Sequence, residues 1–82
     1  MTLENDRRRG DRARQVLENE LFQESFEIME QAIFEEWKYT ADEKKREALW
    51  IMIQMMPRFE AVFVAAVNNG VVASGELKHI LN

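Results

Sequence analysis

The sequence has 82 residues, which is the size of a single domain. It contains no cysteine, and this excludes disulfide frameworks, thiolate nucleophiles, zinc fingers and iron–sulfur clusters built from this chain. Hydrophobic residues make up 46% and charged residues 32%, with three glycines and one proline, a composition that excludes collagen-like and disordered chains and favours helix. Folding a chain of this length hides only a little over about 60% of its unfolded surface, so we expect a thin margin of stability and a tendency to self-associate.

The net charge of −4 is unevenly distributed. Residues 21 to 47 hold eight acidic and four basic groups, whereas residues 1 to 20 hold five of each sign. All the basic groups of that first segment are arginines, namely Arg7, Arg8, Arg9, Arg12 and Arg14. The opening residues lack an apolar core of the length that a signal peptide requires, so none is expected.

Residues 48 to 67 are largely apolar and raise the question of a membrane span. Gln54, Pro57, Arg58 and Glu60 lie near the centre of this stretch. A charge buried there would cost about 2.5 to 3.5 kcal/mol on insertion scales, so we expect the buried stripe of a soluble helix and no membrane partner.

The first expected element is a basic helix or arm over residues 1 to 18, with helix most plausible after Asp11. Asn19 can cap a new helix whose first turn carries Glu20, a favourable charge beside the positive end of the helix dipole. The alternative is one uninterrupted helix through Asn19.

An amphipathic helix is predicted over residues 21 to 38, because large apolar residues recur there at spacings of four and three. They are Phe22, Phe26, Met29, Ile33 and Trp37. Glu36 projects between Met29 and Ile33, so it either pairs with a basic group on the next helix or lies at a wet rim.

The next helix start is predicted at Thr40, because Thr40 and Glu43 match a capping box. Tyr39 and Thr40 then form the turn, and so short a connection makes the two neighbouring helices antiparallel. Residues 19 to 70 are thus expected to form a helical hairpin.

The third helix carries a heptad pattern in which residues recur alternately every three and four positions. The predicted seam consists of Leu49, Met52, Met56, Phe59, Phe63 and Ala66. Pro57 is expected to kink the helix near Gln54 or to split it there. Gly70 is expected to end the helix, which leaves residues 71 to 82 as a connector and short tail.

No set of residues predicts catalysis, a cofactor or a metal. His79 is the single histidine and has no partner at metal-ligand spacing. The glutamates of the second helix lack the Glu-x-x-His motif of diiron bundles, and no nucleophile has a neighbouring base. The sequence therefore predicts a protein that is not an enzyme, with a solvated acidic face on its second helix.

A partner-binding surface is predicted because residues 48 to 56 are apolar at eight of nine positions, more than one hairpin partner can cover. On a helical projection Trp50 falls almost opposite Met52, and Phe34 falls among polar residues. The candidate partner-binding residues are Phe34, Trp50, Ile51, Ile53 and Gln54. For Ile51 and Ile53 the alternative is that the first helix folds back and covers them.

The arginines at positions 7, 8, 9, 12 and 14 are candidate nucleic-acid contacts, since each could neutralise a phosphate. No aromatic residues alternate with them to form a stacking platform, and the middle of the chain is acidic. A solvated arm or a protein contact is therefore favoured over nucleic acid.

The run from Arg12 through Phe26, followed by Trp37-Lys38 and Leu49-Trp50, resembles short, largely uncharacterised helical proteins encoded in tailed-bacteriophage genomes among packaging and virion genes. The resemblance covers residues 12 to 75 and implies a phage context with a role in assembly, in the host cytoplasm or the virion. It carries over no catalytic or ligand residues.

Together these patterns predict an all-α, oligomeric interaction protein that binds copies of itself through its third helix and also binds a phage virion or packaging protein. The alternatives are a nucleic-acid-binding packaging-recognition subunit that uses the arginine cluster, and a small phage inhibitor of a host protein.

Overall fold

The computed structural model describes residues 2 to 81, without the side chain of Leu81. Within this range the chain forms three helices and no strand: α1 (Leu3–Glu18), α2 (Glu20–Tyr39) and α3 (Glu43–Leu81). The all-α prediction is confirmed.

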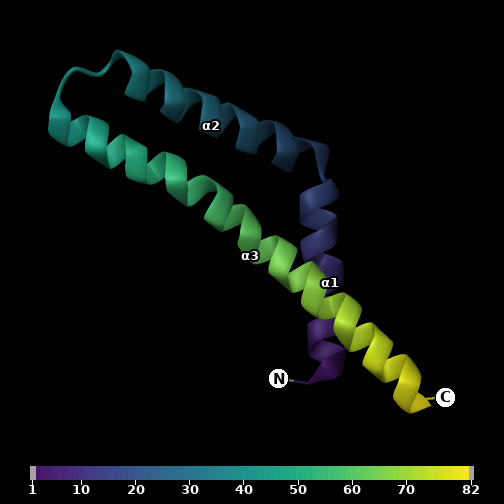
Figure 1. Cartoon of the computed structure of the whole chain (residues 1–82). Coiled ribbons are helices and arrows are strands. Elements are labelled where there is room, and N and C mark those ends of the chain that lie inside the picture. The colour runs from purple at the N-terminus through teal and green to yellow at the C-terminus, as the bar shows by residue number, and fades with distance from the viewer. Residues whose placement is uncertain (1, 82) are drawn as a thin grey trace.

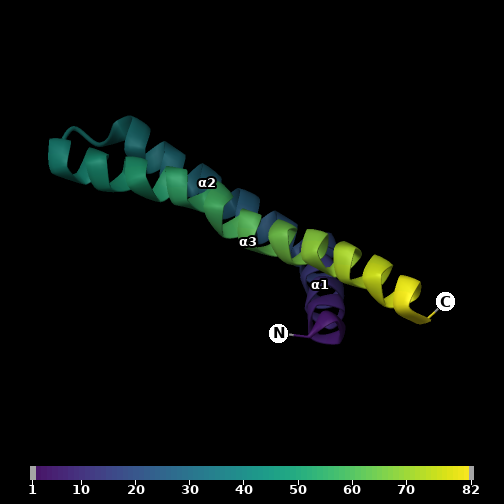
Figure 2. The same cartoon turned by 60° about the horizontal axis from the view of Figure 1, so that its bottom comes forward.

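The three helices form an elongated molecule. Its principal extents are 61, 24 and 13 Å and its radius of gyration is 17.7 Å, whereas a compact chain of this length would have a radius of gyration of about 12 Å. The long helix α3 is the spine, with α2 running in the opposite direction beside its first half and α1 crossing its second half (Figures 1 and 2). Over residues 2 to 81 none of the three helices is packed on all sides.

Helix α1 begins earlier than expected, because Thr2 caps it. The Thr2 hydroxyl accepts a hydrogen bond from the backbone N–H of Asn5 at 3.1 Å. The whole basic arm is therefore helical from Leu3 onward, and Gly10 lies inside the helix.

The corner between α1 and α2 is formed by Asn19, whose backbone is extended. The Asn19 side chain accepts a hydrogen bond from the Phe22 N–H at 2.9 Å, and its own N–H donates to the Val16 carbonyl at 3.2 Å. The prediction of a helix capped by Asn19 is confirmed, and the alternative of one uninterrupted helix is wrong.

The predicted capping box at Thr40 is wrong, and α3 begins at Glu43. The Thr40 hydroxyl donates to the Glu36 carbonyl at 2.6 Å and so belongs to the end of α2. Asp42 takes the capping role, because its side chain accepts from the Lys44 N–H at 3.1 Å.

The end of the third helix predicted at Gly70 is also wrong, because α3 continues as helix to Leu81 through the expected connector. It is likewise one helix on both sides of Pro57, so of the two outcomes expected there, a kink or a split, the split is wrong. Pro57 is exposed. Because proline has no backbone N–H, the helix lacks the hydrogen bond that residue 57 would otherwise donate to the Ile53 carbonyl.

Gly70 serves tertiary packing instead of helix termination. A Cβ atom on Gly10 would lie 2.8 Å from the Gly70 Cα and 2.9 Å from the Ala66 carbonyl oxygen. The backbones of α1 and α3 therefore touch at this crossing, and only glycine at both positions allows it.

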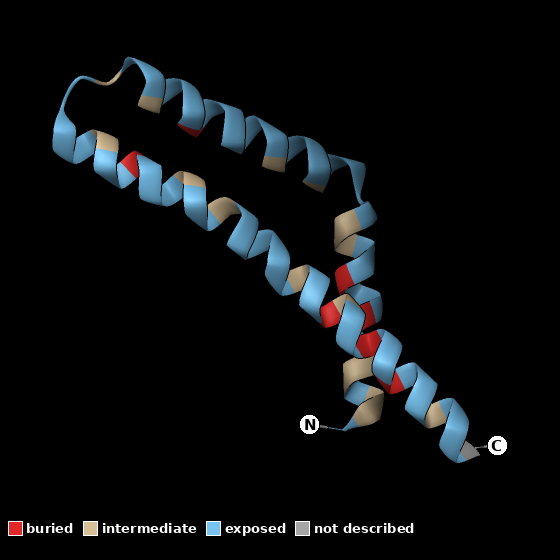
Figure 3. Cartoon of the chain, in the orientation of Figure 1, coloured by how far each residue is buried: buried red, intermediate tan, exposed pale blue. Residues whose placement is uncertain are grey.

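The buried residues are few and mostly small. Those of α1 and the second half of α3 are Gly10, Ala13, Ala66, Gly70 and Ala73. Figure 3 shows buried segments gathered where α1 meets α3. Between α2 and α3 the buried side chains are Ile33 and Leu49. In the described residues no large side chain is completely buried.

The face predicted for α2 is right at four of its five positions. Ile33 is buried, and Phe22, Phe26 and Trp37 are half-buried toward α3, whereas Met29 is exposed. The rings of Phe22 and Phe63 meet edge to face at 5.5 Å between centroids.

The seam predicted for the third helix is right at Leu49, Met56 and Phe63, and it is wrong at Met52 and Phe59, which are 47% and 53% exposed. Ala66 is buried as well, but against α1. Ile53 faces α2 where Met52 was expected. The error arises because the segment is apolar on all sides, so a second heptad pattern lies beside the one that packs.

Candidate partner-binding surface

A continuous row of exposed apolar side chains runs along the first half of α3, and we call it the Met-rich stripe. It consists of Ile51, Met52, Met55, Phe59 and Val62. Steps of one, three, four and three residues keep these side chains on one face of the helix. The stripe departs from the expected seam, because the heptad pattern predicts Met52 and Phe59 to be buried.

The Met-rich stripe continues a face of α3 that is covered farther along the helix. Ala66 and Ala73 lie on the same face of α3 and are buried where α1 crosses. Val62 marks the border, since it lines a shallow groove with Val16 of α1. One face of α3 is thus packed by a helix in its second half and bare in its first half.

A second cluster of exposed aromatic residues lies at the end of the molecule where α2 connects to α3. The ring of Trp37 is 5.7 Å from both Phe34 and Trp50, measured between centroids, so Trp37 lies between the other two. Trp50 is 46% exposed while making this contact within the chain. The Lys38 ammonium lies 5.6 Å from the centroid of the Phe34 ring.

Arg46 holds this end of the molecule together. Its guanidinium donates to the Trp37 and Thr40 carbonyls at 2.7 and 3.1 Å and lies 4.5 Å from the Trp37 ring centroid. These carbonyls close α2, where backbone acceptors lack helical partners. Lys45 and Glu36 form an ion pair at 3.2 Å across the same connection, so the predicted pairing of Glu36 with a basic group is confirmed.

The five residues predicted to bind a partner do not form one surface. Phe34 and Trp50 lie on either side of Trp37, and Ile51 belongs to the Met-rich stripe. Ile53 is half-buried in an open groove of about 300 Å³ between α2 and α3, and Gln54 is exposed.

The alternative in which the first helix covers Ile51 and Ile53 is wrong, because α1 lies over Ala66 and Gly70. Sequence reasoning missed Met55 and Val62 as surface residues. Their spacing from Met52 and Phe59 was the available signal.

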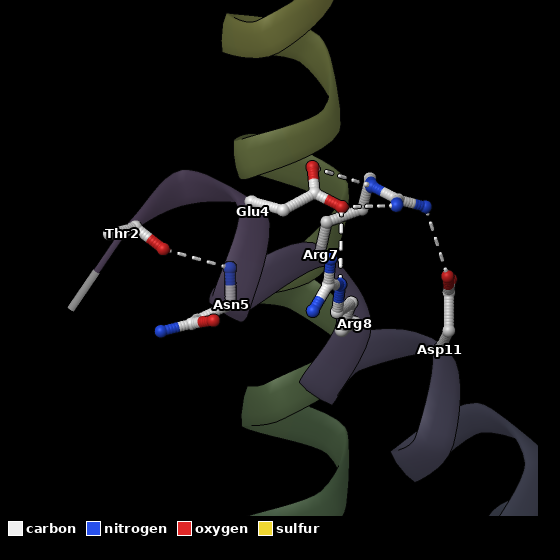
Figure 4. A network of polar contacts seen from close by, with 6 residues as sticks. All are labelled: Thr2, Glu4, Asn5, Arg7, Arg8 and Asp11. Carbon is white, nitrogen blue, oxygen red and sulfur yellow. Dashed lines mark hydrogen bonds and ion pairs between the residues drawn. The ribbon is translucent and has the colours of Figure 1, made fainter.

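The five arginines of α1 are divided between two environments. Arg7 forms ion pairs with Glu4 at 2.5 Å and Asp11 at 3.4 Å, and Arg8 reaches Glu4 at 3.3 Å (Figure 4). Hydrogen bonding from Arg7 lowers the pKa of the Glu4 carboxyl below its ordinary value, and the same bond raises the pKa of Arg7.

The other arginines make no ion pair within residues 2 to 81. Arg9 and Arg12 border the groove between α1 and α3, and Arg14 lies near Gly70 on another side of the crossing. The candidate nucleic-acid contacts therefore do not form one surface of free positive charge.

The chemistry of the remaining surface is limited. Among the described residues no group of three or more His, Cys, Asp or Glu side chains is arranged to hold a metal ion. His79 is exposed. The surface is therefore distinguished by its exposed apolar side chains and not by groups that could bind a metal.

Helix α3 is long and apolar enough to cross a membrane by length and composition. Only 6% of its most apolar 18-residue window is buried in the structure. Arg58 and Glu60 interrupt the apolar run near its middle. Most residues of this window are thus not buried by the rest of the chain.

Comparison with known proteins gives no match: no family model fits the sequence, and no curated protein and no solved structure matches it.

Proposed function

We propose that the chain is a non-enzymatic helical interaction protein that associates with copies of itself, and that it serves as a structural or assembly component of a phage by binding a virion or packaging protein. The observation that carries the self-association is the amount of surface that one chain leaves uncovered.

The uncovered surface can be compared with that of ordinary monomers. The solvent-accessible surface of the chain is 6601 Å², whereas the scaling law for compact monomers gives about 5,100 Å² for 9.7 kDa. The surplus is about 1,500 Å² per chain. Obligate dimers bury about 2,000 to 5,000 Å² in total, or roughly 1,000 to 2,500 Å² per chain, so the surplus is of the size that an obligate interface removes.

The character of the surface supports the same proposal. Exposed large hydrophobic residues occur on both α2 and α3, from Leu21 and Ile28 to Val71 and Ile80. Apolar area in water costs about 25 cal/mol per Å², and monomers rarely expose large continuous patches of it. Association would remove this area from water, and a chain with so small a core needs that contribution.

The assembly role is supported by the resemblance of residues 12 to 75 to helical proteins of tailed phages. A virion or packaging protein would find aromatic anchors at Phe34 and Trp50, since aromatic residues are enriched at interfaces. A coding position beside portal, capsid or terminase genes supports this role, whereas a position in an early-gene cassette contradicts it.

Self-association is tested by co-expressing a tagged copy and an untagged copy of the full chain. The proposal predicts that the untagged copy is retained with the tagged one at physiological salt. Retention of the tagged chain alone would contradict it.

Nucleic-acid binding is the second candidate, and one observation favours it. Arg9, Arg12 and Arg14 make no ion pair in the described part of the chain, so their charges are available to phosphates. If they bind duplex DNA, the affinity falls steeply between about 50 and 200 mM salt, and replacing all three with alanine flattens that dependence. We expect no tight binding at physiological salt.

A further inference from the structure

The Met-rich stripe has the spacing of a helix-packing surface. Met52, Met55, Phe59 and Val62 follow one another at steps of three, four and three residues, which is the pattern that meets another helix. The same face of α3 already packs a helix farther along, because α1 covers Ala66 there. The stripe therefore continues an existing helix–helix interface, and a helix is the occupant that its shape fits.

The composition of the stripe favours a second copy of this chain. Its five side chains are uncharged, so two copies can face each other without like-charge repulsion. Two methionines and a phenylalanine make such a surface adaptable, since methionine fills irregular gaps. The ring of Phe59 is already held at 5.4 Å from the ring of Phe63 in an edge-to-face contact, so one large anchor is ordered before association.

The surplus area points to the same occupant. The chain exposes about 1,500 Å² more surface than a compact monomer of its mass. Contact between identical stripes covers the same area on both chains at once, as a two-fold interface does.

We propose that the Met-rich stripe of one copy packs against the Met-rich stripe of a second copy, with the two α3 helices crossing antiparallel about a two-fold axis near Met55 and Phe59. The proposal rests on the proposed function, because it names the surface through which self-association occurs.

The position of α1 constrains how the two helices meet. On each chain α1 occupies the same face of α3 beyond Val62, so the second α3 cannot run along the whole helix and has to cross it. Antiparallel crossing about a two-fold axis places residues near the axis beside their own counterparts. Met55 of one chain should therefore lie near Met55 of the other.

Single cysteine variants test this geometry directly, because the chain has no cysteine of its own. Under mild oxidation most chains of Met55→Cys should become disulfide-linked dimers, since packed helices bring facing Cα atoms within disulfide reach. Val72→Cys is the matched control, because Val72 is 60% exposed but lies on another side of α3. It should remain largely unlinked. Equal linking of the two variants would overturn the proposal.

A charged variant supplies a second readout. Phe59 is exposed within one chain, so Phe59→Glu should act through the interface and lower the mass in solution to 9.7 kDa. Because so small a core depends on association for stability, the melting temperature should fall as well. Val72→Glu should keep the mass of the unmodified protein.

The failures of the two proposals are distinguishable. One result would refute the stripe as the interface but keep the proposal of self-association. In that result the tagged chain retains the untagged chain, yet Phe59→Glu keeps the full mass and Met55→Cys does not form a disulfide. If the unmodified chain is monomeric and instead binds phospholipid vesicles, with binding lost in Phe59→Glu, the stripe is a membrane contact and both proposals are overturned.

Discussion

Adding one methyl group at the crossing of α1 and α3 tests the packing that orders this molecule. Gly10→Ala would place a Cβ atom 2.8 Å from the Gly70 Cα and 2.9 Å from the Ala66 carbonyl oxygen. Both are backbone atoms, so no side chain can rotate away, and α1 has to move off α3. The buried contacts of Ala13 and Ala73 at the same crossing weaken with it.

The magnitude follows from two opposing effects. In a helix interior, alanine is more favourable than glycine by about 0.5 to 1 kcal/mol. Overpacking costs typically about 1 to 3 kcal/mol, and here it acts on backbone atoms that cannot adapt. We therefore expect Gly10→Ala to lower the free energy of unfolding by about 1 to 2 kcal/mol, which shifts the melting temperature down by about 4 to 16 °C for a domain of this size.

Gly75→Ala is the matched control, because its added Cβ meets nothing within 4 Å. It lies in the same helix as Gly70 and should raise stability by about 0.5 to 1 kcal/mol through helix propensity alone. Thermal unfolding followed by circular dichroism, at one protein concentration for all variants, measures both effects. If Gly10→Ala raises the melting temperature as Gly75→Ala does, the close crossing of α1 and α3 is wrong.

Three further predictions concern the ends of the helices. Arg46→Met removes the donor to the Trp37 carbonyl and the cation over its ring, so the urea midpoint should fall by the equivalent of about 1 to 3 kcal/mol, and an unchanged midpoint would refute this role. Asn19→Ala removes a helix cap and should cost about 1 kcal/mol in the same assay, with Asn19→Gly costing less; an unchanged midpoint in Asn19→Ala would mean that the cap contributes little. An NMR titration of the Glu4 carboxyl should give a pKa below the ordinary value of a glutamate, and in Arg7→Ala this pKa should return toward that value. Because that pKa is lowered, the small contribution of the pair to stability is present at neutral pH and is lost as the pH falls through the lowered pKa.

The local signals of the sequence predict the helices well where one face dominates. The helical spacing of Phe22, Phe26, Ile33 and Trp37, at steps of four, seven and four, identifies the side of α2 that packs. Asn19 marks a true helix start. Each of these predictions depends on neighbouring residues alone, which is why no tertiary information was needed.

The errors occur where tertiary contacts decide. The sequence pattern predicts that Gly70 ends the helix. The glycine is inside α3 instead because it contacts Gly10, which is 60 positions away in the chain and so cannot be inferred from neighbouring residues. Met52 and Ile53 are neighbours on a helix that is apolar all round, so periodicity cannot tell which of two adjacent heptad patterns packs. The candidate surface was therefore assigned to the right segment of α3, with part of it on the wrong face.

The central claim is that this chain works as an assembly of copies, and its mass in solution tests that claim most directly. Light scattering on the unmodified protein, over a series from low to high micromolar concentration, should give a multiple of the 9.7 kDa chain mass. The surplus of about 1,500 Å² over a compact monomer predicts that the multiple persists at the low end of the series. A mass of 9.7 kDa at every concentration would contradict the account.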